Sequence, residues 1–155
     1  VCTGPFDGSA DPSVNKEDFL FGVSKSMKFL CANPDIVVDR GEVRQYCAGA
    51  LAKMYTEMGG ESLYFGKPHN AIYDLARMRL AELGAPIDSK KILAIGDGIG
   101  TDIKGANSQK IDSLFVTGGL AAKETLTVHS PNPEALEKYI TKQKVQCTYS
   151  IGYLR

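Results

Sequence analysis

Hydrophobic and polar positions change their spacing along the chain, and this change divides it into two pieces. After residue 60, short apolar runs alternate with stretches of helical periodicity. The apolar runs lie at 62–65, at 92–95, at 111–116 and between Cys147 and Leu154. An alternation of strands with helices predicts a parallel sheet with right-handed crossovers.

The first 60 residues follow a different pattern. A helix is expected after Asn15, on apolar positions that recur at helical spacing. These positions are Phe19, Leu20, Val23, Met27 and Leu30. The runs 36–38 and 43–46 flank Asp39-Arg40-Gly41-Glu42, which predicts a hairpin, and a second helix is expected to stop at Gly59-Gly60. We therefore predict a domain boundary near Gly60, between the pieces 1–60 and 61–155.

Composition narrows the class of protein. The chain has 155 residues, 43% of them hydrophobic, which suffices for one α/β domain or for one domain and part of another. Lysine and arginine together equal aspartate and glutamate at 18 each. Because the charges balance and form no basic field, we expect neither nucleic acid nor an anionic membrane surface as a partner.

Signals for export and for membrane insertion are missing from the sequence. No apolar stretch approaches the roughly 20 residues of a membrane span, and no signal peptide opens the chain. The four cysteines are scattered without a CxxC pair, which favours reduced thiols and a cytoplasmic location. The opening Val1-Cys2-Thr3-Gly4-Pro5 is typical of a strand entering a loop, so we expect a truncated start.

Candidate chemistry follows two of the expected strands. Asp97 lies two residues after the run 92–95, Asp102 follows shortly, and Lys67 lies two residues after the run 62–65. Because a single helix is expected between those strands, both groups should emerge at one edge of one sheet, where open parallel sheets bind ligands. Two carboxylates suit a divalent cation. A lysine and a helix start near Thr101 suit phosphate.

Each of these residues also has an ordinary structural interpretation. A lysine after a strand is commonly a solvated surface residue, Gly96-Asp97 alone is typical of a turn, and Asp102 could favour a helix dipole. Other known sites are excluded by the sequence. Gly96-x-Gly98-x-Gly100 does not match the GxGxxG motif of dinucleotide-binding folds, because position 101 is threonine. The P-loop motif GxxxxGK[ST] does not occur, and the two histidines lack the partners of a zinc site.

The motif Gly66-Lys67-Pro68, followed by Gly96-Asp97-Gly98-x-x-Thr101-Asp102-Ile103, closely resembles the haloacid dehalogenase (HAD) superfamily. The similarity is greatest to the branch with a large α/β cap before the lysine motif, which includes nitrophenylphosphatase-like and sugar-phosphatase-like enzymes. Cys31-Ala-Asn-Pro-Asp35 and Tyr64-Phe-Gly-Lys-Pro-His69 are similar to that branch too. The resemblance implies an α/β fold, with a Rossmann-like parallel sheet of HAD type at 61–155 as a partial core. Residues 1–60 would be part of an inserted α/β cap domain.

The resemblance also implies a Mg²⁺-dependent phosphatase acting on a small phosphorylated metabolite. In such enzymes an aspartate attacks phosphorus, and water hydrolyses the resulting aspartyl-phosphate. Carried over by motif, Lys67 would neutralise phosphate charge, Asp97 would bind the metal, and Asp102 would hold the metal's water shell or orient Lys67. Asn33 and Asp35 would lie in the cap and contact the substrate, although a plain turn explains them equally well.

One departure from the family pattern is serious. The nucleophile of the family comes from an Asp-x-Asp after the first core strand, and no Asp-x-Asp occurs in these 155 residues. The serine or threonine that binds phosphate cannot be located either. We therefore expect the carboxyl-terminal portion of a HAD hydrolase, inactive alone. A partial core would also expose a sheet face and a sheet edge, so we expect self-association.

Three other interpretations remain open. The chain could be a non-catalytic HAD-like module that binds phosphate or Mg²⁺ as a regulator. It could equally serve a phosphotransferase or phosphomutase, which would use the same site with a different acceptor. A receiver-type signalling domain also combines acids with a lysine, but it places the acids before the lysine, the reverse of the order here.

Overall fold

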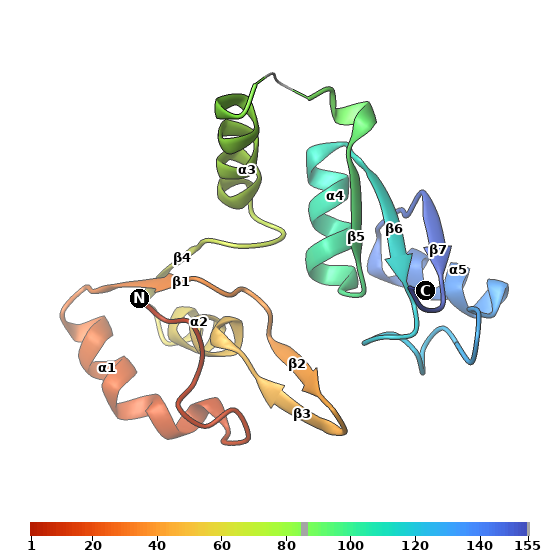
Figure 1. Cartoon of the computed structure of the whole chain (residues 1–155). Coiled ribbons are helices and arrows are strands. Elements are labelled where there is room, and N and C mark those ends of the chain that lie inside the picture. The colour runs from red at the N-terminus through yellow and green to blue at the C-terminus, as the bar shows by residue number, and fades with distance from the viewer. Residues whose placement is uncertain (85–86, 155) are drawn as a thin grey trace. The chain divides into compact units, whose positions relative to one another are not determined.

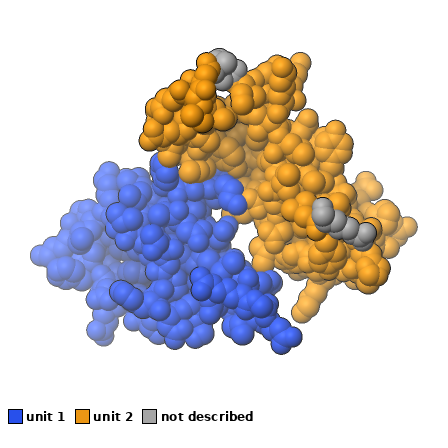
Figure 2. All heavy atoms as spheres, viewed as in Figure 1, with its two compact units in different colours: residues 1–69 blue, residues 70–155 orange. Residues whose placement is uncertain are grey.

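The computed structural model describes residues 1–84 and 87–154 and divides into two compact units, 1–69 and 70–155 (Figure 2). Unit 1 ends at His69. The predicted domain boundary near Gly60 stays a prediction. The assignment of the two pieces to a cap and a core stays a prediction. In the described part of the chain, no helix has the length and apolar character required to cross a membrane.

Unit 1 (1–69) combines two helices with a parallel strand pair and an antiparallel hairpin (Figure 1). Its elements are η1 (Pro12–Asn15), α1 (Lys16–Ser24), β1 (Lys28–Cys31), β2 (Val37–Arg40), β3 (Val43–Tyr46), α2 (Ala48–Glu57) and β4 (Glu61–Tyr64). The strands β1 and β4 are parallel, with Lys28 opposite Glu61 and Cys31 opposite Tyr64. The antiparallel pairing of β2 with β3 confirms the predicted hairpin.

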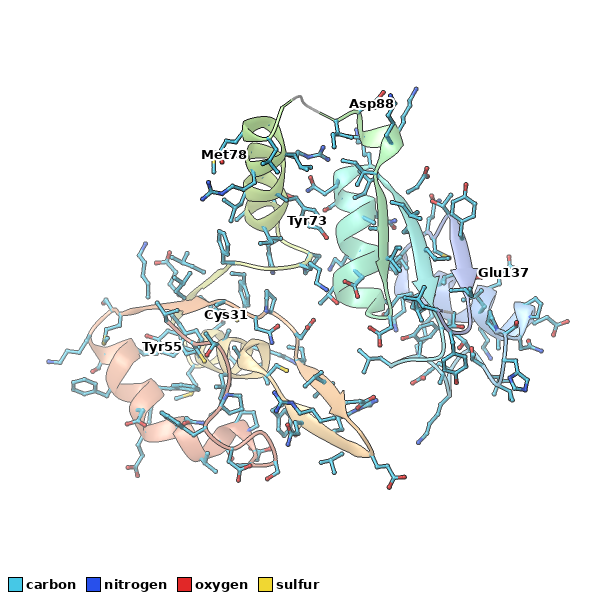
Figure 3. All side chains as sticks on the ribbon, in the orientation of Figure 1. Cys31, Tyr55, Tyr73, Met78, Asp88 and Glu137 are labelled. Carbon is cyan, nitrogen blue, oxygen red and sulfur yellow. The ribbon has the colours of Figure 1, made fainter. Side chains whose placement is uncertain are left out.

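The helix α2 forms the centre of unit 1, because its small residues allow it to lie close against its neighbours. Ala48 and Ala52 are fully buried and contact Cys31 of β1. Tyr55 packs with Phe19 and Leu51, and its hydroxyl donates a hydrogen bond of 2.6 Å to the carbonyl of Met27. Figure 3 shows Cys31 and Tyr55 in this core. The predicted second helix is confirmed, and Gly59 after it has a φ of 93°.

The first predicted helix is partly wrong. The structure ends α1 at Ser24, and the segment Lys28–Cys31 that contains the last expected helical position is strand β1. Ser26 has a φ of 52°, which a continuing right-handed helix cannot accommodate. Parallel pairing with β4 then supplies the backbone hydrogen bonds of this segment. On the other edge of β1, Cys2 forms an isolated parallel bridge with Cys31.

Unit 2 (70–155) is built around a three-stranded parallel sheet in the order β5-β6-β7. Its elements are α3 (Asn70–Glu82), η2 (Ser89–Lys91), β5 (Leu93–Gly96), the π-helix η3 (Ile99–Ile103), α4 (Lys104–Gln109), β6 (Asp112–Val116), α5 (Pro133–Gln143) and β7 (Tyr149–Ile151). The strands and helices predicted for this stretch are confirmed. Asn132 caps α5 as expected, since its side chain accepts a hydrogen bond from the backbone of Ala135.

One face of this sheet is packed against other elements, whereas the opposite face is largely exposed. On one face, Phe115 of β6 is fully buried with Ile103 and Ala121, and Leu136 and Tyr139 of α5 pack against this cluster. Strand register places six apolar side chains on the opposite face: Leu93, Ile95, Leu114, Val116, Tyr149 and Ile151. Four of them are well exposed, at 45% for Leu93, 51% for Ile95, 58% for Tyr149 and 37% for Ile151. We call this set the open sheet face.

Candidate functional site

Asp97 follows the last residue of β5 and is held by a turn distant in sequence. Its Oδ2 atom accepts a hydrogen bond of 3.2 Å from the backbone N–H of Leu120, in the loop after β6. Gly119 lies so close to this carboxylate that a Cβ atom there would overlap it, at 2.7 Å from Asp97 Cγ. The parallel pairing of β5 with β6 brings these two strand ends together. Asp97 is therefore half-buried at the carboxyl edge of the sheet, with one carboxylate oxygen fixed.

Asp102 lies on η3 and closes the loop that contains Asp97. Its side chain is buried at 9% exposure, and its Oδ2 atom accepts a hydrogen bond of 3.0 Å from the backbone N–H of Gly98. The backbone N–H of Asp102 in turn donates to the carbonyl of Gly98 at 2.8 Å. Gly96 leaves room for the carboxylate, because a Cβ atom there would lie 2.5 Å from Asp102 Cβ. We call the segment 96–102 the acidic loop. The two hydrogen bonds between Gly98 and Asp102 hold its backbone in one conformation.

Lys67 lies in unit 1, on the segment Gly66–His69 that follows β4, and its side chain is exposed. The peptide bond between Lys67 and Pro68 is cis. The rings of Tyr64 and His69 stack at a centroid distance of 4.8 Å, and the N–H of His69 donates to the carbonyl of Gly66 at 2.9 Å. We call Gly66–His69 the lysine segment.

The predicted sheet environment of Lys67 is wrong. In the described residues, β4 pairs with β1 in unit 1, whereas β5, which carries Asp97 at its end, pairs with β6 in unit 2. Which strands pair in a parallel sheet depends on contacts between distant segments. The single helix predicted between β4 and β5 was therefore not sufficient to place both strands in one sheet. The convergence of Lys67 with Asp97 and Asp102 on one ligand stays a prediction.

Asn33 and Asp35 line a cavity of ≈ 500 Å³ in unit 1. The side-chain oxygen of Asn33 accepts a hydrogen bond of 3.3 Å from the backbone of Asp35. The hairpin β2–β3 contributes the side chains that the sequence analysis did not select, namely Arg40, Gln45 and Tyr46. The loop at 3–8 forms another wall, where the N–H of Tyr46 donates to the carbonyl of Gly8 at 2.7 Å. The cavity therefore offers acidic, basic and amide groups to a polar ligand.

Cys47 also lines this cavity, and its surroundings keep it in the thiol form. Burial raises the pKa of Cys47, and the nearby charge of Asp35 raises it further, while Arg40 opposes the shift. A thiol with a raised pKa is a weak nucleophile, because the thiolate is the reactive form. Its raised pKa therefore argues against a nucleophilic role for Cys47.

The acidic loop has the donor chemistry for Mg²⁺, though it supplies only part of a coordination sphere. Carboxylate oxygens are the ligands that Mg²⁺ takes from proteins, and the cation commonly keeps several waters. In residues 1–84 and 87–154, no group of three or more His, Cys, Asp and Glu side chains could hold a metal ion. Asp97 and Asp102 thus fit the cation in kind, and its other ligands would be water, phosphate or further protein groups.

Comparison with known proteins assigns the class. The fold is mixed α/β with parallel strands. A possible sugar phosphatase of the HAD superfamily from Cytophaga hutchinsonii shares it at a TM-score of 0.68 and 21% identity, over 88% of this chain and 45% of that one. The p-nitrophenyl phosphatase of Archaeoglobus fulgidus gives a TM-score of 0.60 and 21% identity, over 86% of this chain and 46% of that one.

The model of the HAD-hydrolase-like family matches residues 64–142, and the chain belongs to this family. A haloacid dehalogenase-like hydrolase from Brucella suis is 34% identical, with a TM-score of 0.78, over 98% of this chain and 54% of that one. The 5'-nucleotidase YutF of Bacillus subtilis is 28% identical over 127 residues, which are 79% of this chain and 48% of the relative. The chain therefore spans about half the length of these relatives.

Proposed function

We propose that the chain is part of a Mg²⁺-dependent phosphatase that hydrolyses a small phosphorylated metabolite. Family membership supports a hydrolase of HAD type. The observation that carries the proposal is the acidic loop, in which Gly98 and Leu120 donate backbone hydrogen bonds to Asp102 and Asp97 at the carboxyl edge of a parallel sheet. This edge is where open α/β sheets bind their ligands.

The described residues have separate roles in this proposal. Asp97 offers the cation a carboxylate whose second oxygen is already held by Leu120. Asp102 keeps the acidic loop closed through Gly98, and it would bind the water shell of the cation or orient Lys67. The exposed ammonium of Lys67 would neutralise phosphate charge. The cation, when bound, would polarise the phosphoryl group.

The nucleophile has to come from outside these residues. In the proposed chemistry, an aspartate carboxylate oxygen bonds to phosphorus as the bond from phosphorus to the ester oxygen breaks, and the departing alkoxide takes a proton from water. Water then attacks the phosphorus of the aspartyl-phosphate, which returns the carboxylate and releases inorganic phosphate and a proton. The sequence contains no Asp-x-Asp to supply such an aspartate. Lys67 can compensate charge in both steps without forming a bond to phosphorus.

Substrate selection is assigned to the cavity of unit 1. Asn33 and Asp35 line it, and Arg40 and Gln45 add groups that can bind an anion or a hydroxyl. The relatives are named as a 5'-nucleotidase, a possible sugar phosphatase and a p-nitrophenyl phosphatase. Substrates of these names are all phosphate esters and differ in the group that carries the phosphate. A cavity with mixed polar groups suits a small phosphorylated metabolite.

Hydrolysis of p-nitrophenyl phosphate with Mg²⁺ tests the proposal in two preparations. This chain alone should show no turnover, since it lacks the nucleophile. The protein extended by the sequence upstream of Val1 should hydrolyse the ester, and Asp97→Asn should lower its kcat/KM by a factor on the order of 10³. Robust turnover by the 155-residue chain that Asp97→Asn abolishes would refute the missing-nucleophile part of the proposal.

The second candidate is a non-catalytic HAD-like module that binds phosphate or Mg²⁺. The lack of an Asp-x-Asp in the sequence favours it. Binding of Mg²⁺ and phosphate by the extended protein without hydrolysis of any phosphate ester would select this candidate over the phosphatase.

We also propose that this chain self-associates when it is isolated. The support is the open sheet face, where Ile95 is 51% exposed and Leu93 is 45% exposed. β5 is an edge strand of the sheet, so its outer backbone groups have no strand partner in the described residues. A second copy could cover this surface and remove its apolar side chains from water.

A further inference from the structure

The loop after β6 lies directly against the carboxylate of Asp97. Gly119 carries no side chain where one would overlap the Asp97 carboxylate, and the next backbone N–H, that of Leu120, donates to Asp97 Oδ2 at 3.2 Å. No other hydrogen bond to Asp97 is found in the described residues. This N–H is thus the contact that sets the direction of the carboxylate.

Three buried threonines hold this loop from inside the unit. Thr117 and Thr125 are fully buried, and Thr127 is 9% exposed. Their hydroxyls form a hydrogen-bonded chain, with 2.8 Å between the hydroxyls of Thr125 and Thr127 and 2.9 Å from Thr127 to Thr117. The Thr117 hydroxyl donates to the carbonyl of Ile151 at 3.1 Å. We call Thr117, Thr125 and Thr127 the threonine cluster.

The threonine cluster is connected to the turn at Asp97 through short backbone contacts. The hydroxyl of Thr125 reaches the carbonyl of Ala121 at 2.7 Å, and the N–H of Thr125 donates to the same carbonyl at 2.9 Å. The N–H of Ala122 donates to the carbonyl of Gly119 at 3.1 Å. At the other end of the loop, the N–H of Thr117 donates to the carbonyl of Ile151, and the N–H of Gly118 donates to the carbonyl of Gly152, both at 2.8 Å. The position of Gly119 and Leu120 is therefore fixed on both sides.

We propose that the Gly119–Leu120 turn, held by the threonine cluster, positions Asp97 for its cation. The N–H of Leu120 occupies one carboxylate oxygen of Asp97, and the other oxygen would be left to bind the cation. Groups that orient a metal ligand in this way commonly contribute 10- to 100-fold to metal affinity. Thr125 is a positioning residue in this scheme, because it acts through Ala121 and the turn and not by contact with the cation. The inference rests on the proposed Mg²⁺ site.

Calorimetric titration of Mg²⁺ into this chain tests the inference, with four variants. Gly119→Ala should weaken Mg²⁺ binding roughly 10-fold or more, because the added methyl group displaces Asp97. Thr125→Val removes the hydroxyl with little change in shape and should weaken binding about 3- to 10-fold, whereas Thr125→Ser should restore it. Gln143→Ala is the control and should leave Mg²⁺ binding unchanged, since Gln143 is exposed at the end of α5, outside the acidic loop.

A second readout distinguishes a positioning role of Thr125 from a purely structural one. Ser113→Ala removes another buried hydroxyl of the same sheet, one that accepts from Thr148 away from the turn. It should lower the melting temperature as Thr125→Val does, yet leave the Mg²⁺ affinity unchanged. In amide hydrogen exchange, the Leu120 N–H should lose protection in Thr125→Val and not in Ser113→Ala.

The outcomes are distinct. An unaltered chain that binds no Mg²⁺ overturns the proposed site itself. An unaltered chain that binds Mg²⁺, with equal affinity in Gly119→Ala and Thr125→Val, overturns the positioning role alone. Equal losses in Thr125→Val and Thr125→Ser also overturn it, because the hydroxyl would then not be the group that matters.

Discussion

The acidic loop and the lysine segment both follow a strand end, but they are held in different ways. In the acidic loop, Asp102 is buried and bonded to Gly98, and Asp97 is bonded to Leu120 from another strand end. In the lysine segment, Lys67 is exposed, while Tyr64 stacks on His69 and the N–H of His69 donates to the carbonyl of Gly66. Asp102 is thus buried and Asp97 half-buried in unit 2, whereas Lys67 is an exposed residue. Substitution of the buried Asp102 should therefore lower stability more than substitution of Lys67.

The largest expected effect on stability is at Asp102. Asp102→Ala leaves the buried N–H of Gly98 without its acceptor and opens a small void, which should lower the free energy of unfolding by about 2–3 kcal/mol. Urea unfolding followed by circular dichroism measures this change. Asp74→Ala is the control, because Asp74 is exposed on α3 and should change stability by less than about 0.5 kcal/mol. Equal small losses in both variants would show that Asp102 does not hold the acidic loop.

The sheet that carries the acidic loop should also govern association. Ile95→Lys places a charge on the open sheet face, at a position that is already 51% exposed. It should shift the isolated chain towards the monomer in light scattering, since a charge is costly to bury against a second copy. Leu83→Lys is the matched control, because Leu83 is 85% exposed and lies outside the sheet. Monomers in the unaltered chain would contradict self-association.

A smaller effect is expected at the lysine segment. Lys67→Ala should change the free energy of unfolding by less than about 0.5 kcal/mol, because the side chain is exposed. It should weaken binding of inorganic phosphate in the presence of Mg²⁺ by about 2- to 5-fold, as expected for an exposed ion pair. Lys138→Ala, another exposed lysine, should leave phosphate binding unchanged. A loss of stability at Lys67 without a loss of phosphate binding would reverse the comparison.

The smallest expected effect is on the pH dependence of stability, and it arises from cysteines of unit 1 and not from the acidic loop. Burial raises the pKa of Cys31 and of Cys47, so the folded chain keeps both thiols protonated at a pH where the unfolded chain loses the protons. The unfolded state then binds fewer protons, and stability falls as pH rises above the ordinary cysteine pKa of about 8.5. The double variant Cys31→Ala/Cys47→Ala should show a flatter decline between neutral and alkaline pH. Parallel profiles for the two proteins would contradict these shifts.

Local patterns in the sequence predicted most elements of unit 2, because each depends on neighbouring residues. The run before Asp97 became β5, and Asn132-Pro133 began α5 with the expected cap. The same reasoning missed β1 in unit 1. Met27 and Leu30 continued the helical spacing of α1, but the turn at Ser26 and the pairing of Lys28–Cys31 with β4 override that local preference.

Long-range contacts explain what the sequence could not predict. The motif identified Asp97 and Asp102 as candidate ligands, yet only the structure places Leu120 on Asp97. The glycines at 118 and 119 were a visible signal, although they indicated a strand end and not a close approach to a carboxylate. Arg40 and Gln45 of the cavity lie on hairpin strands, where ordinary charged and polar residues are common, so nothing in their pattern marked them.

The most direct test of the cation site uses Mn²⁺ in place of Mg²⁺, since both prefer oxygen ligands and octahedral geometry. Paramagnetic Mn²⁺ added to the isotope-labelled chain should broaden the amide signals of 96–102 and of Gly119 and Leu120 first. Asp97→Asn should remove this selective broadening, while Asp74→Asn should preserve it. Uniform broadening of exposed carboxylates, or selective broadening that survives Asp97→Asn, would contradict the assignment of the acidic loop as a metal site.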